Sequence, residues 1–127
     1  MRLVIIDQEN NLMQVGIDGN FYEGLDGSEL AENIHAVQWN NESGEVEYKD
    51  PQTGNMTTNE QITDISTFQF AIDAWQAEYD AEQAAIALAQ AKADAYQSAY
   101  DQAIANGDSE EDAMAAGNAA SDAVTSL

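Results

Sequence analysis

Few residues in this chain are of the kinds that catalyse reactions or bind metals. His35 is the only histidine, and the 127 residues include no cysteine. A Cys/His catalytic pair and a zinc site of several histidines therefore cannot be assembled within one chain. No serine lies in a G-x-S-x-G turn, which excludes a serine triad of that kind. We expect His35 to serve packing or hydrogen bonding.

Carboxylates are the remaining chemical groups, and the chain has 24 acidic residues. Acid–base catalysis needs a partly buried carboxyl group with a shifted pKa. Glu82 is the one acid embedded in an apolar pattern. We interpret it as a residue that sets helix register or oligomeric state, as polar residues do in coiled coils. A calcium-dependent or acid-catalysed enzyme is the disfavoured alternative.

Residues 18–29 resemble part of a calcium-binding loop. Asp18, Asn20 and Glu29 match its positions 1, 3 and 12. The required glycine at position 6 is replaced by Glu23, and Gly24 comes one residue late. We interpret the segment as an ordinary turn-rich loop, and we expect neither a metal site nor a cofactor.

The charge of the chain restricts its partners. Three basic residues against 24 acidic ones leave a net charge of -21. This field repels nucleic acids and anionic membrane surfaces, so we expect no partner of either class. Aromatic residues such as Trp39 and Trp75 could stack on bases, but without positive charge we assign them to packing. The apolar run after Arg2 is too short for a signal peptide or a membrane span.

The amino-terminal half is predicted to form a small antiparallel β domain over residues 1–63. β-branched and alternating patterns predict strands at 2–6, 12–17, 34–39 and 44–49. A short strand is expected to begin at Phe21, and another at Met56 to Thr58, which makes five or six strands in all. Ser28 could cap one helical turn between them.

A long helix is predicted to follow, over about residues 65–105, within a helical region of residues 64–127. Apolar residues recur there at alternating steps of four and three, which is typical of a helix that lies along another helix. Glu82, Ala89, Ala93 and Ala103 fall in the same register. The large residues of this seam, which we take as the interaction residues, are Phe68, Ile72, Trp75, Tyr79, Ile86, Tyr96 and Tyr100.

The two ends of this helix are expected to have different partners. Aromatic residues crowd its first turns, so residues 65–79 should cover the sheet. Asn106-Gly107 should end it, and Ser109 or Asp108 should cap a second helix over about residues 110–125. That helix would fold back as a helical hairpin along the last third of the long one. The middle, residues 82–93, is left to solvent or to another chain.

The order of several short motifs resembles a group of phage proteins. The motifs are His35-Ala36-Val37-Gln38-Trp39, Gly44-Glu45-Val46-Glu47-Tyr48-Lys49-Asp50 and Asn59-Glu60-Gln61-Ile62-Thr63-Asp64, followed by Phe68 and Trp75. Over residues 34–75 they are similar to small proteins encoded near tail and tail-fibre genes of tailed bacteriophages. These are commonly virion parts, fibre adaptors or fibre-assembly chaperones.

The resemblance and the helical seam together predict a non-catalytic structural protein of the virion. Its place would be the tail, the baseplate or the fibre attachment region, with other virion proteins as partners and with helix pairing between copies. The alternative is a tail-fibre assembly chaperone that binds transiently and leaves.

Overall fold

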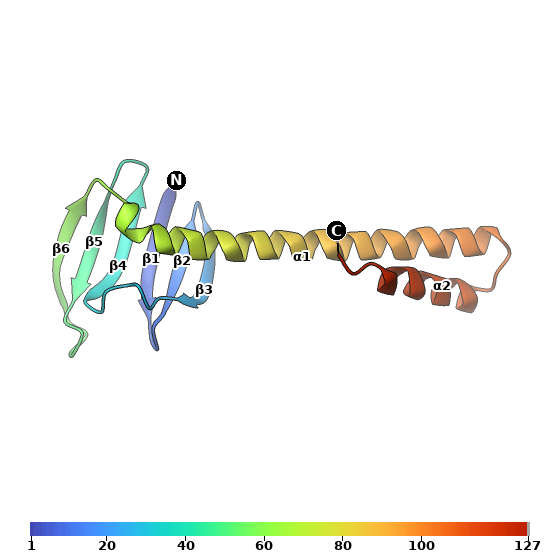
Figure 1. The fold of residues 1–127 in the computed structure, drawn as a ribbon, viewed down its shortest axis with the longest axis horizontal. Coiled ribbons are helices and arrows are strands. Elements are labelled where there is room, and N and C mark those ends of the chain that lie inside the picture. Colours follow the sequence, from blue (N-terminus) through green and yellow to red (C-terminus); the bar gives the residue numbers. More distant parts are fainter. Residues whose placement is uncertain (127) are drawn as a thin grey trace. The chain divides into compact units, whose positions relative to one another are not determined.

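Six strands precede two helices in the computed structural model, which describes residues 1–126 (Figure 1). The strands are β1 (Arg2–Gln8), β2 (Leu12–Ile17), β3 (Asn20–Asp26), β4 (Ile34–Asn40), β5 (Ser43–Lys49) and β6 (Met56–Ile62). A 3-10 turn η1 (Ser66–Phe68) leads into α1 (Gln69–Ala105), and α2 (Glu110–Ala123) follows. The predicted α+β class is confirmed.

All strands belong to one antiparallel sheet in the order β3-β2-β1-β4-β5-β6. Leu3 in the central strand β1 is opposite Ile17 on one side and Trp39 on the other. Since side chains alternate along a strand, these residues share one face of the sheet. We call this the inner face and the opposite one, which carries Val4 and Ile6, the outer face.

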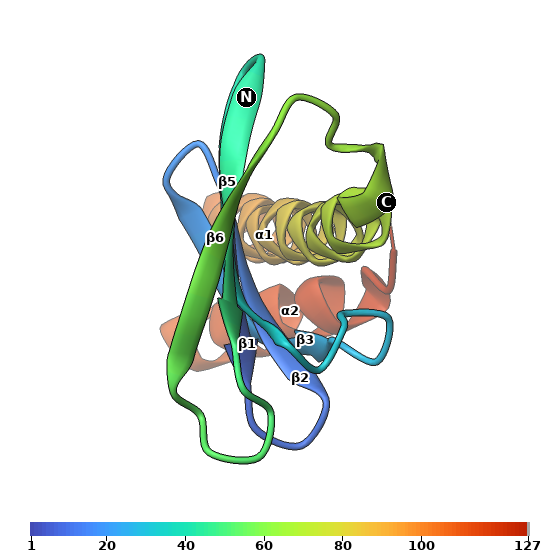
Figure 2. The same cartoon turned by 90° about the vertical axis from the view of Figure 1, so that its left-hand side faces the viewer.

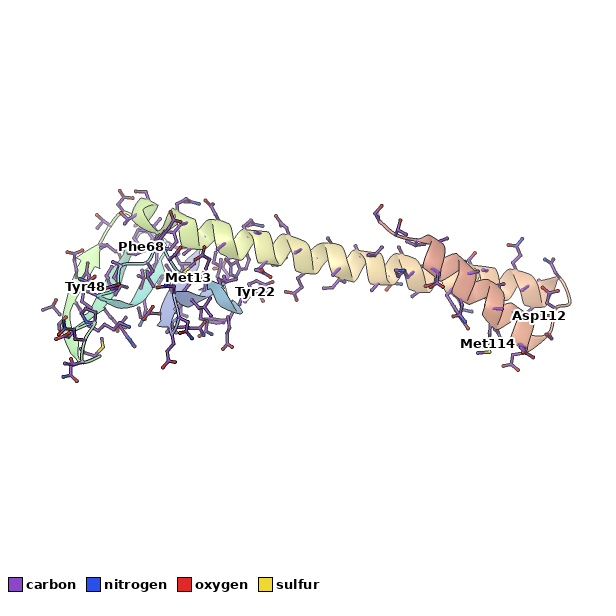
Figure 3. All side chains as sticks on the ribbon, turned by 60° about the horizontal axis from the view of Figure 1, so that its bottom comes forward. Met13, Tyr22, Tyr48, Phe68, Asp112 and Met114 are labelled. Atoms are coloured by element: carbon purple, nitrogen blue, oxygen red, sulfur yellow. The ribbon has the colours of Figure 1, made fainter. Side chains whose placement is uncertain are left out.

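The inner face forms the core together with the start of α1. Leu3, Ile5, Met13, Val15 and Val37 are fully buried there. On the helical side, Phe68, Ala71 and Trp75 belong to the same apolar cluster. The first turns of α1 lie against one side of the sheet in Figure 2, and Met13 and Phe68 are labelled on the facing elements in Figure 3.

The compact units of the structure divide at a different residue from the predicted boundary. Contacts group Met1–Tyr79 into one unit and the chain from Asp80 onward into another. We predicted a β domain that ends at residue 63, with residues 65–79 of the helix covering its sheet. The first turns of α1 belong with the sheet because Phe68, Ala71 and Trp75 are part of its core.

Two local predictions in the sheet domain were wrong. β6 continues to Ile62 instead of ending at Thr58, because residues 59–62 pair with β5, although Asn59, Glu60 and Gln61 are polar and the segment lacks a strand pattern. Ser28 begins no helix. Its backbone N–H donates to Asp26 Oδ1 at 3.0 Å, so the aspartate closes a turn at this point of the chain.

The ends of the helices follow the predicted signals. Gly107 has a φ of +90°, and the N–H groups of Gly107 and Asp108 donate to the carbonyls of Ile104 and Ala103. This is a Schellman motif, which requires a left-handed residue after the helix. Ser109 is the N-cap of α2, and its Oγ accepts from the Asp112 N–H at 3.1 Å. The predicted start at about residue 110 is confirmed.

Candidate interaction surfaces

The first four residues of the predicted seam lie in the sheet core and not on a free helix surface. Phe68 and Trp75 are buried, and Ile72 and Tyr79 are half-buried against the core. A coiled-coil partner cannot use the buried side chains, because α1 already packs them against the inner face. Their heptad spacing arises here from helix-on-sheet packing.

Trp75 is the centre of an aromatic cluster with Tyr79 and Tyr22. The predicted seam included Trp75 and Tyr79 but not Tyr22. The Trp75 ring stacks on Tyr79 at 5.0 Å between centroids and contacts Tyr22 at 5.8 Å. The indole Nε1 donates to the backbone carbonyl of Asn20 at 2.8 Å. Tyr22 was missed because it comes from β3, and no local pattern places β3 beside α1. The ring contact and the hydrogen bond therefore link the edge strand β3 to α1.

Tyr96 and Tyr100 are half-buried in a helical hairpin within the second unit. Their rings stack at 6.1 Å between centroids, and a Cβ added to Gly117 would lie 2.7 Å from the Tyr96 ring. Lys92 Nζ donates to the Ser121 carbonyl at 3.2 Å. The pairs 92–121 and 96–117 descend in register, so α2 runs antiparallel to α1, as Figure 1 also shows. The tyrosines therefore pack against α2.

The register of this hairpin differs from the predicted seam. Ala89 and Ala93 are exposed, whereas Lys92, Ala95 and Ala99 are half-buried. An α-helix advances 100° per residue and not along a strict 3.5-residue repeat, so the contact face shifts along α1. Ala103, Ala113 and Gly117 form the buried part of the contact.

Residues 80–90 of α1, at the start of the second unit, form a mostly exposed stretch. Every residue from Asp80 to Gln90 is exposed except Leu88, which is half-buried. Ile86, the fifth residue of the predicted seam, is 56% exposed. Seven of these eleven residues are apolar: Ala81, Ala84, Ala85, Ile86, Ala87, Leu88 and Ala89. This segment, residues 80–90, is hereafter the bare stretch of α1.

A polar groove lies at one end of the sheet domain. It has a volume of about 770 Å³. It is lined by the β1–β2 turn, the segment before β4, the last residue of β5 and the loop that follows β5. Lys49 forms an ion pair with Asp7, and His35 lies in the same wall. Because β4 separates β1 from β5 in the sheet, the pair links two strands that are not neighbours. We assign it a structural role.

The pKa values of Asp64, Asp26 and Tyr48 depart from their ordinary range. The Ser66 backbone N–H donates to Asp64 Oδ1 at 2.9 Å and lowers the pKa of that carboxyl, and the Ser28 N–H lowers the pKa of Asp26 in the same way. Desolvation raises the pKa of Tyr48, with a further contribution from the nearby Glu60. Both aspartates close turns, so these shifts mark local structure.

Within residues 1–126, no group of three or more His, Asp or Glu side chains is placed to hold a metal ion. Asp18, from the calcium-loop comparison, accepts a hydrogen bond from the Arg2 backbone N–H at 2.8 Å. No helix among those residues is both long and apolar enough to cross a bilayer.

Comparisons with known proteins do not place the chain in a family. No protein-family model matches it, and searches of curated proteins and of solved structures found no match.

Proposed function

We propose that this chain is a non-catalytic structural protein of a phage virion, in the tail, baseplate or fibre attachment region. The observation that carries the proposal is the bare stretch of α1. The helix has 37 residues, and in its residues 80–90 it has an apolar composition while every side chain but that of Leu88 is exposed. The motifs of residues 34–75 that resemble phage tail proteins supply the setting.

The bare stretch is better suited to contact with another protein than to full exposure to solvent. In proteins, a helix gains most of its stability from packing an apolar face against a neighbouring element. Ile86 and Leu88 are the only large apolar side chains in the stretch, and alanines surround them, so a partner helix could approach closely. A partner of this kind is either a second copy or another virion protein.

The distribution of charge along α1 favours the bare stretch as the site of contact with another protein. The bare stretch has two acidic residues, Asp80 and Glu82, and from Gln83 to Gln90 it has no charged residue. In a chain of net charge -21, such a segment is where another acidic protein could come close with the least repulsion. Electrostatic attraction would contribute to binding only with a basic partner.

The test is the protein content of purified particles. We expect mass spectrometry to find this chain at a fixed ratio to the tail proteins. Absence from washed, infectious particles would contradict the structural role and favour the alternative, a tail-fibre assembly chaperone that leaves. In that case the chain should co-purify with unassembled fibre protein from infected cells.

A variant pair tests the surface itself. Ile86→Asp places a charge on the bare stretch, and we expect it to abolish incorporation while the chain stays folded. Met56→Asp is the matched control, because Met56 is 52% exposed and lies on β6. Equal incorporation of both variants would exclude the bare stretch as the contact.

A further inference from the structure

A second groove in the first unit lies between the β2–β3 turn and the first turns of α1. It has a volume of about 490 Å³. Small-molecule sites commonly measure roughly 300–1,000 Å³. Ile72, Trp75 and Tyr79 form an apolar wall on the side of α1, and Ile17 continues this wall on β2. All the residues that line it belong to Met1–Tyr79, so the groove lies within one unit. We call it the aromatic groove.

The aromatic wall of this groove is held in place but not fully enclosed. Trp75 is 7% exposed, and its indole Nε1 donates to the Asn20 backbone carbonyl at 2.8 Å. Its ring stacks on Tyr79 with 12° between the ring planes. Tyr79 is only half-buried, so part of its ring surface is open to a ligand. Because the stack already fixes this ring, a ligand that packs on it has little side-chain entropy to offset.

Polar side chains with planar groups lie beside the apolar wall. They are Asp18, Asn20 and Gln76. Asp18 Oδ1 accepts from the Arg2 backbone N–H at 2.8 Å, which orients the carboxylate. An ionised carboxylate has two acceptor oxygens and can accept further hydrogen bonds, and an amide side chain both donates and accepts. Such groups suit a ligand with several hydroxyls, because each hydroxyl also donates and accepts.

The charge of the aromatic groove disfavours ionic ligands. None of the described residues that line it is lysine, arginine or histidine, and the Met1 amine donates to Asn41 Oδ1. A phosphate or carboxylate ligand would therefore meet Asp18 in a chain of net charge -21. A cation would find one carboxylate among these residues, and that carboxylate already accepts a hydrogen bond. A neutral ligand fits this lining best.

We propose that the aromatic groove binds a neutral saccharide. One face of a pyranose ring lies on Tyr79, and hydroxyls at the edge of the ring bond to Asp18 and Asn20. A pyranose has C–H groups on its faces and hydroxyls around its edge, so a single ligand satisfies both the apolar wall and the polar groups. The proposal does not depend on a place in a virion, because the groove belongs to residues 1–79 alone.

The test is a titration of the full chain with glucose, galactose and N-acetylglucosamine, followed by NMR of the indole N–H groups. Each sugar is added up to about 50 mM, which nearly saturates a site with a Kd of about 1 mM. We expect at least one sugar to shift the Trp75 signal. Trp39 is buried and does not line the groove, so its indole signal is the internal reference and should not move.

Two variants test the two kinds of contact. Asn20→Ala removes the amide but keeps the backbone carbonyl that accepts from Trp75, and it should weaken binding about two- to tenfold. Tyr79→Leu removes the ring surface and should weaken binding by about the same factor. Asn59→Ala makes the same amide truncation on β6, outside the groove, and should leave the Kd unchanged. Near-ultraviolet circular dichroism establishes that each variant is folded.

Three results would overturn the proposal. The first is that none of the three sugars shifts the Trp75 signal at the highest concentration. The second is that glycerol shifts it as strongly as the sugars, which indicates general solvation by polyols. The third is tighter binding of tyramine, a cationic amine, or of glucuronate, an anionic sugar, which assigns the groove to a charged ligand.

Discussion

Different kinds of side chain stabilise the interior of each of the two units of this chain. In residues 1–79, large apolar residues such as Leu3, Trp39 and Trp75 fill a core between the sheet and the start of α1. From Asp80 onward, the buried residues are Ala103, Ala113 and Gly117. The first unit depends on burial of apolar area, and the second on helix propensity, caps and close approach of small residues.

This difference predicts separate responses to mutation. Removing a large side chain should damage the sheet unit, whereas adding one should damage the hairpin. The predictions below are ordered by the size of the expected effect.

Trp75→Ala should have the largest effect. It removes a buried ring, its stack on Tyr79 and its hydrogen bond to Asn20, and such truncations cost about 3–5 kcal/mol. We expect loss of the sheet in a thermal melt followed by circular dichroism, with helical signal from the second unit retained. Tyr79→Phe, which keeps the stacked ring, is the control. Loss of both units in one transition would contradict their independence.

Gly117→Leu should open the hairpin. A Cβ at this position would lie 2.7 Å from the Tyr96 ring, so the larger side chain must displace it, at a cost of about 1–3 kcal/mol. Limited proteolysis should then cut α2 faster while residues 1–79 stay protected. Asn118→Leu introduces the same side chain at an exposed position and should not change the rate. Unchanged protection of α2 in Gly117→Leu would show that the two helices are not closely packed.

Ser109→Ala should weaken α2 more modestly. It removes the side-chain acceptor of the Asp112 N–H, and loss of such a cap costs about 1 kcal/mol. Amide hydrogen exchange in the first turn of α2 should accelerate, with no change in the sheet. Ser126→Ala, outside the helix, is the control. Equal exchange in both variants would count against the cap.

Asp64 should give the smallest effect, and one that depends on pH. Its folded pKa lies below the ordinary value of 3.8, so its contribution is present above that value and is lost as pH falls through the folded pKa. We expect Asp64→Asn to be less stable than the natural chain at neutral pH, and the difference to shrink as the pH falls below 3.8 and through the lowered folded pKa. Glu78→Gln removes one charge at an exposed site and controls for general repulsion. A stability difference that does not change with pH would exclude this explanation.

Local sequence signals predicted most of the elements, the end of α1 and the start of α2. The β-branched segments before residue 50, the continuous helix to Ala105, the left-handed Gly107 and the cap before residue 110 all depend on neighbouring residues in the chain. Interactions over three or four residues decide such features, because φ preference and side-chain capping act locally. The α+β class followed from the order of these elements.

The tertiary structure alone decided which side chains meet. β4 lies next to β1 although two strands intervene in the chain, and Tyr22 reaches Trp75 across 53 positions of sequence. The polar residues 59–61 form a strand because β5 offers them backbone partners, a long-range effect that composition does not encode. The residues of the predicted seam have three different environments: Trp75 lies in the sheet core, Ile86 is exposed, and Tyr96 packs in the hairpin. A repeat of apolar residues determines that one face of a helix is apolar, and only the fold determines what covers that face.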